Sequence, residues 1–252
     1  MPAVTICAVT KMRDAWFWRA AVVCLLWLNG AGAASADMVE RTGTFEGVAL
    51  TYKVVLPRGF DPAKTYPAVL VFTGGPQLLR MAESTLDSDW RVEAERRGYI
   101  VISPGTPDGS LFFEAADRVF PSFLDQLLKE YRIAGNRFHV AGHSNGGLSA
   151  FHVAARYPQY FATVTGYPGL LNGVDQAKAS GIKALCLFMH VGDRDDGWRE
   201  AMERQAQALS RAGYRVRLTV EPNQVHRLKA AEINLSSRLF TQIESCTSSV
   251  TP

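Results

Sequence analysis

The sequence predicts an α/β fold in three layers, with a mostly parallel, doubly wound sheet between helices. From residue 48 onward, short β-rich runs alternate with amphipathic segments of helix length, which is the pattern of strands joined by crossover helices. Several of the runs are apolar at every position, as strands buried on both faces must be. The 252 residues are 47% hydrophobic and 20% charged, which suffices for one sizeable core and excludes a disordered chain.

The first 36 residues have the composition of an export signal. A basic stretch ends at Arg19, an apolar run covers residues 20–28, and Ala34-Ser35-Ala36 offers the small residues that a signal peptidase accepts. We expect cleavage before Asp37, with Ala31-Gly32-Ala33 as the alternative site. The competing interpretation is an uncleaved interfacial anchor, because aromatic residues flank the apolar run, which is too short to span a bilayer.

Residues 1–36 are therefore predicted to be a signal peptide and residues 37–252 a single domain. The protein is expected to be secreted or periplasmic, with no membrane span after cleavage. Residues 37–252 carry 24 basic and 23 acidic side chains. This balance gives no basic face for nucleic acid and no polybasic membrane patch, so a neutral or weakly charged small-molecule or oligomeric partner fits best.

The elements of the domain follow in chain order. Residues 48–56 alternate in polarity and are expected to form an antiparallel edge strand. The other expected strands are residues 69–73, 99–103, 138–141, 162–165, 184–190 and 215–220. Helical spacing occurs in residues 90–97, 120–131, 145–157, 198–212 and 231–246. Gly98 and Gly213 stop two of these helices, and Pro158 follows a third.

Two cysteines remain after cleavage of the leader. Cys186 lies in an apolar strand-like run, and Cys246 lies on the apolar face of the last helix. Export makes a disulfide between them possible, but two buried thiols would give the same pattern. No metal is implied, because two isolated cysteines and five scattered histidines lack the close spacing of zinc ligands.

The most informative motif joins an expected strand directly to an expected helix. It reads Gly142-His143-Ser144-Asn145-Gly146, a Gly-x-Ser-x-Gly pattern. A serine on such a sharp turn has its hydroxyl clear of the backbone at the carboxyl edge of the sheet, and the glycines permit close strand-helix contact. Ser144 is therefore the candidate nucleophile, with an ordinary turn after a strand as the alternative.

A serine hydroxyl needs a histidine base that is oriented by a carboxylate. His226 alone lies beyond the acidic cluster that follows the nucleophile, so it is the candidate base. Asp195 best fits the position of the acid after the strand 184–190, while Asp193 and Asp196 stay open and one of the three is expected to cap the next helix. The other histidines are assigned to packing or lie too far away: His139, His143, His152 and His190.

Acyl transfer also needs N–H donors for the negative charge that develops on the carbonyl oxygen. The backbone of Asn145 is one candidate, and Gly75 in the turn Thr73-Gly74-Gly75-Pro76-Gln77 is the other, because Pro76 has no N–H. A plain Gly-Gly-Pro turn is the alternative. Four aromatic residues fall in loops at the carboxyl edge and could line a substrate pocket or simply pack: Phe112, Phe113, Tyr167 and Trp198.

Together these residues resemble secreted α/β-hydrolase esterases of the polyhydroxybutyrate depolymerase and feruloyl esterase type. The resemblance covers residues 48–230 and rests on the run 56–62 before Tyr66-Pro67, the Gly-Gly turn, the serine motif, and Tyr157-Pro158 with Phe161-Ala162. It implies hydrolysis of carboxylic esters through an acyl-enzyme, without metal or organic cofactor. One departure is Thr73, which replaces the histidine that usually opens the oxyanion turn.

Residues 170–182 lie between the strand after the nucleophile helix and the strand before the acid. This connection is too short for a separate lid domain, which predicts an open site. Two other functions compete with an esterase. One is a serine peptidase of the prolyl-oligopeptidase type, which shares the serine turn and the order of the triad. The other is a hydrolase-fold binding protein without turnover, for which Thr73 is the hint.

Overall fold

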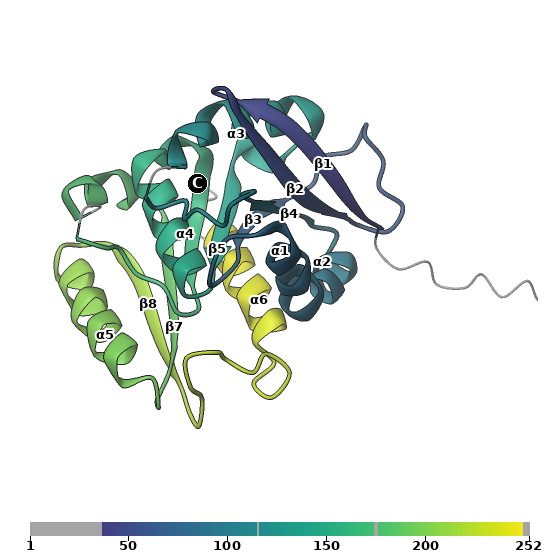
Figure 1. Cartoon of the computed structure of the whole chain (residues 1–252). Helices are drawn as coiled ribbons and strands as arrows, with labels where there is room; N and C mark the ends of the chain where they lie inside the picture. The colour runs from purple at the N-terminus through teal and green to yellow at the C-terminus, as the bar shows by residue number, and fades with distance from the viewer. Residues whose placement is uncertain (1–36, 115, 174–175, 249–252) are drawn as a thin grey trace, which may run out of the picture. The chain divides into compact units, whose positions relative to one another are not determined.

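The computed structural model describes residues 37–114, 116–173 and 176–248, so the expected signal peptide lies outside the described residues. One eight-stranded sheet organises this part of the chain, in the order β1-β2-β4-β3-β5-β6-β7-β8 (Figure 1). The strands are β1 (Asp37–Phe45), β2 (Val48–Leu56), β3 (Ala68–Phe72), β4 (Ile100–Gly105), β5 (Phe138–Gly142), β6 (Phe161–Gly166), β7 (Cys186–Gly192) and β8 (Arg215–Glu221). From β4 to β8 all neighbouring pairs are parallel, which confirms the expected fold class.

The antiparallel end of the sheet differs from the sequence prediction. β2 pairs antiparallel with β1 on one side and with β4 on the other, so it is an inner strand and its assignment as the edge was wrong. The true edge is β1, a largely exposed strand that the sequence analysis missed because its polar residues carry no apolar alternation. A tight turn at Glu46 and Gly47, both with positive φ, joins the two strands into a hairpin.

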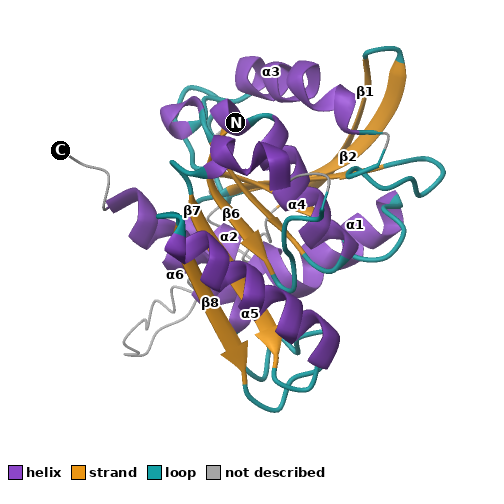
Figure 2. Ribbon diagram, turned by 90° about the vertical axis from the view of Figure 1, so that its left-hand side faces the viewer, coloured by secondary structure: helices purple, strands orange, loops and turns teal. Residues whose placement is uncertain are grey.

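Helices flank the sheet on both faces (Figure 2). Alternate residues of β3 divide the core: Leu70 and Phe72 pack in one apolar cluster, while Val69 and Val71 pack in another. The first cluster includes side chains of α3 (Phe120–Glu130), α4 (Asn145–Arg156) and α5 (Asp196–Arg211). The second includes side chains of α2 (Arg91–Arg97) and α6 (Leu235–Ser248). The sheet is therefore buried on both sides, as its continuous apolar runs predict.

One helical region escaped the sequence analysis. Helix α1 (Leu79–Thr85) runs directly into a π-helical segment, η1 (Leu86–Trp90), before α2. The polar residues Thr85 and Asp89 occupy buried positions there, so the apolar period that marks a helix is interrupted. The remaining short helical segments are η2 (Asp117–Val119), η3 (Ala134–Asn136), η4 (Pro158–Tyr160) and η5 (Gln176–Ile182). In the described ranges no helix has the length and apolar content that crossing a bilayer requires.

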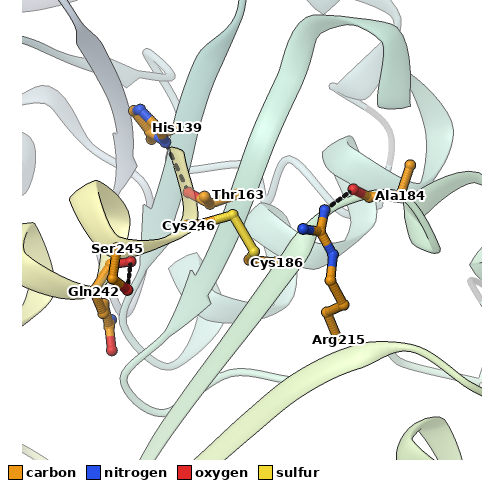
Figure 3. Close-up of a disulfide and its surroundings, with 8 residues drawn as sticks. All are labelled: His139, Thr163, Ala184, Cys186, Arg215, Gln242, Ser245 and Cys246. Atoms are coloured by element: carbon orange, nitrogen blue, oxygen red, sulfur yellow. Dashed lines mark hydrogen bonds between the residues drawn. A yellow bond between two sulfur atoms is a disulfide. The ribbon is translucent and has the colours of Figure 1, made fainter. Parts of the chain in front are cut away.

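A disulfide joins the start of β7 to the end of α6 (Figure 3). Cys186 and Cys246 are both buried and are separated by 60 residues in the chain. Of the two interpretations that the sequence left open, the structure has the bridged one. The cross-link fastens the last helix to the sheet and shortens the loops available to the unfolded chain, which stabilises the folded state.

Candidate active site

The sharp turn between β5 and α4 sets the position of Ser144. Its backbone has φ 57° and ψ −120°, a conformation that non-glycine residues rarely adopt outside functional sites. A Cβ at Gly142 would overlap the backbone of Gly146, and one at Gly146 would overlap the carbonyl of Phe72. The two flanking glycines are thus required by close backbone contacts, and the serine side chain lies free of the helix.

His226 connects the candidate nucleophile to a carboxylate. Its Nε2 lies 2.8 Å from Ser144 Oγ, and its Nδ1 lies 2.8 Å from Asp195 Oδ2. With Nδ1–H donating to the carboxylate, Nε2 is the acceptor for the serine hydroxyl proton. The side chain of Asp195 is 13% exposed and that of His226 is 39% exposed. The carboxylate is thus largely shielded from solvent, while the imidazole remains accessible.

The three aspartates after β7 occupy different environments. Asp195 stands at the N-cap position of α5, but its side chain makes no capping bond and turns to His226 instead. Asp193 accepts a hydrogen bond from the backbone N–H of Gln224 at 3.2 Å. Asp196 is exposed in the first turn of α5 and pairs with Arg199. The expected aspartate thus occupies the N-cap position of α5, but no side chain caps this helix with a hydrogen bond.

The loops after β7 and β8 are tied to each other, which fixes the distance between acid and base. The backbone N–H of Asp193 donates to Glu221 and that of Arg194 donates to Gln224. The Gln224 side chain in turn accepts from the backbone N–H of Lys229 at 2.9 Å, across the loop that carries His226. Sequence reasoning missed Gln224, whose buried amide bridges this loop.

Gly75 and Asn145, the candidate oxyanion donors, lie against each other. Asn145 donates from its side-chain amide to the carbonyl of Gly75 at 3.3 Å. Gly75 has φ +64°, which a glycine adopts without strain. Within the described chain, neither backbone N–H donates to another protein group. Both donors are therefore available to a developing oxyanion.

Thr73, which stands where the esterases that the sequence resembles usually have a histidine, anchors the turn of residues 73–77 to α1. Its hydroxyl lies 3.0 Å from that of Thr85 and 3.2 Å from the carbonyl of Met81, which it can reach as donor. Gln77 adds a second support, because its buried amide donates to Ser149 on α4 at 2.9 Å and accepts from the backbone of Phe112. Sequence reasoning missed this contribution of Gln77, which no local pattern signals.

Two of the four expected pocket residues are core residues instead. Phe112 is fully buried between Phe72 and Phe120, with ring centroids 5.3 and 5.2 Å away. Tyr167 is 1% exposed, and its hydroxyl accepts a hydrogen bond from Trp90 at 2.9 Å. Both side chains therefore pack in the interior, the alternative that the sequence left open.

The other two expected pocket residues keep some exposure. Trp198 is partly exposed, and its ring centroid lies 5.3 Å from that of His226. Phe113 is partly exposed as well. Trp198 therefore flanks the candidate base directly, and it can present an apolar surface beside the serine.

The remaining histidines are buried, and one of them borders the site. His143 lies with its ring centroid 5.5 Å from that of His226, and burial lowers its pKa to about 4, with the charges of Arg227 and His226 adding to the effect. It is thus neutral near pH 7 and packs under the Gly74 turn. His139, His152 and His190 bond to Thr163, Asp117 and Glu221, respectively, in the interior.

No group of three or more His, Cys, Asp or Glu side chains gathers at metal-binding distance in the described residues. The arrangement at the carboxyl edge of the sheet instead joins a free hydroxyl, an oriented imidazole, a shielded carboxylate and two unused N–H donors. These are the groups that acyl transfer requires.

No known protein-family model matches the sequence. Among curated proteins, the chain is 33% identical over 147 residues to dipeptidyl-peptidase 5 of Porphyromonas gingivalis, which covers 51% of this chain and 20% of the peptidase. Among solved structures, a ferulic acid esterase superposes with a TM-score of 0.66 at 17% identity, over 85% of this chain and 98% of the esterase. A putative dipeptidyl aminopeptidase IV from Bacteroides ovatus superposes with a TM-score of 0.65 at 18% identity, over 85% of this chain and 36% of the other.

The chain thus matches only 20% of the length of that curated peptidase but nearly the whole of a solved esterase. At identities of 17% and 18%, the superpositions speak to the fold. The serine turn between β5 and α4 and the chain order Ser144, Asp195, His226 are also features of this fold. The chain has the α/β-hydrolase fold.

Proposed function

We propose that the protein is an exported serine hydrolase that cleaves carboxylic esters through an acyl-enzyme. The observation that carries the proposal is the continuous hydrogen-bonded chain from Ser144 through His226 to Asp195, with both links at 2.8 Å. Nucleophile, base and orienting acid come from three separate loops. Packing alone does not require these three side chains to meet, whereas a catalytic triad does.

In the proposed reaction, Ser144 Oγ attacks the ester carbonyl carbon while His226 Nε2 takes the hydroxyl proton. Asp195 stabilises the resulting imidazolium, and the N–H groups of Gly75 and Asn145 hold the oxyanion. His226 then gives the proton to the departing alcohol, leaving an ester bond between the acyl group and Ser144. A water molecule, deprotonated by the same imidazole, releases the acid and restores the serine.

Trp198 and Phe113 are the proposed apolar contacts of the substrate. Their partial exposure contrasts with the complete burial of Phe112 and Tyr167. The short connection between β6 and β7 supports an open site without a separate lid domain. A depolymerase-like or feruloyl-esterase-like preference is part of this proposal and rests on the sequence resemblance together with the esterase superposition.

A peptidase is the second candidate, favoured by the 33% identity to dipeptidyl-peptidase 5 over 147 residues. The esterase is preferred because the superposed ferulic acid esterase is matched over 98% of its length, whereas the peptidases are matched over 20% and 36%. Rates on 4-nitrophenyl acyl esters and on dipeptide anilides separate the two. Faster cleavage of the anilides, compared as kcat/KM, would reverse the preference.

A fluorophosphonate tests the reactive serine without knowledge of the substrate. The wild-type protein is expected to be labelled at Ser144, while His226→Ala is labelled far more slowly because the hydroxyl keeps its proton. Mass spectrometry of the modified peptide locates the label. An unlabelled wild-type protein would favour the binding protein without turnover.

Export is proposed from the composition of residues 1–36 and from the disulfide, a bond that forms in oxidising compartments. When the full chain is expressed in a bacterium with a secretion pathway, the mature protein is expected to begin at Asp37. N-terminal sequencing of the exported fraction tests this. A protein that retains residues 1–36 in a membrane fraction would favour the uncleaved anchor.

A further inference from the structure

A cavity of about 600 Å³ lies beside the candidate catalytic residues. It is lined by the oxyanion turn, by α1 and by the loop that follows β8. The lining residues are Thr73, Gly74, Gly75, Arg80, Met81, Ser84, Thr85, His143 and Arg227. The sequence analysis singled out neither of the two arginines in this set.

The cavity is next to the candidate active site through the oxyanion turn and through chain neighbours of the serine and its base. Gly75, a candidate oxyanion donor, forms part of its wall. His143 directly precedes Ser144 in the chain, and Arg227 directly follows His226. A group bound in this space therefore lies next to the turn whose N–H group is proposed to hold the substrate carbonyl.

The charge of the cavity wall is of one sign. Arg80 and Arg227 are cationic, and none of the lining residues is acidic. Arg80 is exposed and makes no ion pair or side-chain hydrogen bond with the rest of the described chain. Arg227 is paired with Asp89 behind the wall, so Arg80 supplies the positive charge that no carboxylate of the described residues balances.

Arg227 is held in place while part of its guanidinium stays free. Its Nη2 contacts both carboxylate oxygens of Asp89 at 3.2 Å and the hydroxyl of Ser88 at the same distance. The Asp89 side chain is 4% exposed, whereas that of Arg227 is 49% exposed. All three contacts use one nitrogen, so Nε and Nη1 have N–H groups with no partner in the described residues. A fixed guanidinium with unused donors is suited to bind a carboxylate.

We propose that this cavity binds a carboxylate of the substrate, held by Arg80 and Arg227, so that the enzyme prefers esters that also carry a free acid group. The proposal rests on the proposed ester hydrolysis and names the substrate class for the same site. Thr73, Ser84 and Thr85 line the same space with hydroxyl groups. The buried Asp89 keeps Arg227 oriented, and the bound acid completes the hydrogen bonding of its guanidinium.

The test compares 4-nitrophenyl hydrogen adipate with its methyl-capped diester. The wild-type protein is expected to show kcat/KM about 10-fold higher for the free acid, as a charge-assisted hydrogen-bonded pair allows. Arg80→Gln should bring this ratio close to one, and 1 M salt should reduce it in the wild type. Arg211→Gln, an exposed arginine at the end of α5, is the matched control and should keep the ratio.

Equal rates on the two esters in the wild type, or a ratio that Arg80→Gln leaves unchanged, would overturn the carboxylate site while leaving ester hydrolysis intact. A separate binding measurement decides the matter if neither ester is turned over. Calorimetry on Ser144→Ala should then detect monoethyl adipate but not diethyl adipate, and this difference should vanish in Ser144→Ala/Arg80→Gln. Equal binding of both compounds, or binding of neither, would reject the site.

Discussion

Among the histidine–carboxylate pairs of the described residues, His226–Asp195 and His190–Glu221 have opposite surroundings. His226 bonds to Asp195 through Nδ1 and to a serine hydroxyl through Nε2, with 39% of its side chain exposed. His190 bonds to Glu221 through Nδ1 at 2.8 Å and to Gln242 through Nε2 at 3.0 Å, with 3% of its side chain exposed. The first imidazole has a reactive partner and access; the second has neither.

The comparison teaches that a histidine–carboxylate pair is not by itself a catalytic feature. In the interior pair, Glu221 also accepts two hydrogen bonds from Arg238 at 2.8 Å. Burial opposes ionisation of Glu221, but the bonds from His190 and Arg238 lower its pKa overall. This network links β7, β8 and α6, so its expected contribution is to stability. The His226–Asp195 pair, which lies in loops, is instead expected to contribute to turnover.

The largest effect is expected at the serine and its base. Ser144→Ala and His226→Ala should each lower kcat for a 4-nitrophenyl ester by roughly 10⁴–10⁶-fold, because nucleophile and base act as one unit. The melting temperature should change little, since both residues lie at the sheet edge. Substantial activity in both variants, measured on protein free of contaminating esterase, would contradict the mechanism.

Asp195→Asn should cost less, about 10²–10⁴-fold in kcat, because the amide leaves the geometry intact but disfavours the required tautomer. Asp196→Asn is the matched control: its carboxylate is exposed and should be nearly silent. Asp193→Asn is expected to lie between them, since Asp193 holds the Gln224 backbone. A larger loss at position 193 or 196 than at 195 would reassign the acid.

Removal of the disulfide tests the part of the fold in which α6 is fastened to β7. Cys186→Ala/Cys246→Ala should lower the free energy of unfolding by about 2–4 kcal/mol, as expected for a cross-link that closes a loop of 60 residues. Urea denaturation measures the change. Because the bridge lies at the opposite end of β7 from Asp195, kcat of the folded variant should stay near the wild-type value. A loss of kcat in the folded variant would show that the disulfide and the candidate active site are coupled.

Glu221→Gln addresses the interior pair itself. The loss of a buried, charge-assisted network should destabilise the fold by about 1–3 kcal/mol. Ester turnover per folded molecule should remain unchanged, in contrast to Asp195→Asn. Stability from denaturant melts and kcat from active-site titration separate the two effects. A kcat loss without destabilisation would give the interior pair a role in the reaction.

The smallest effect near neutral pH is expected from His139. Burial lowers its pKa from 6.5 to about 4, so the unfolded chain binds a proton that the folded chain does not between these values. Folding stability should therefore fall as the pH drops from about 6.5 toward 4, and remain unaffected by this group above that range. His139→Gln should flatten this part of the stability curve, and an unchanged slope would show that the histidine charges within the fold.

Local sequence patterns were enough to identify the parallel sheet, the serine turn and the candidate nucleophile and base. Strands such as β3 are apolar throughout, and the Gly-x-Ser-x-Gly motif lies within five consecutive residues. The strands and the serine turn each depend on residues close together in the sequence. A hydrophobic pattern or a short motif is therefore enough to predict them. The hairpin strand β1 was missed because it lacks alternation of apolar and polar residues. Helix α1 was missed because it lacks a clear apolar helical period.

Tertiary structure alone decided which side chains meet across long separations. It distinguished Asp195 from Asp193 through the loop after β8, turned Phe112 and Tyr167 into the core, and joined Cys186 to Cys246. It also brought Arg80 and Arg227 to one cavity. These contacts depend on how distant loops pack and on where each side chain can be buried. No spacing along the chain encodes them, because the energy that selects them arises only when the sheet has assembled.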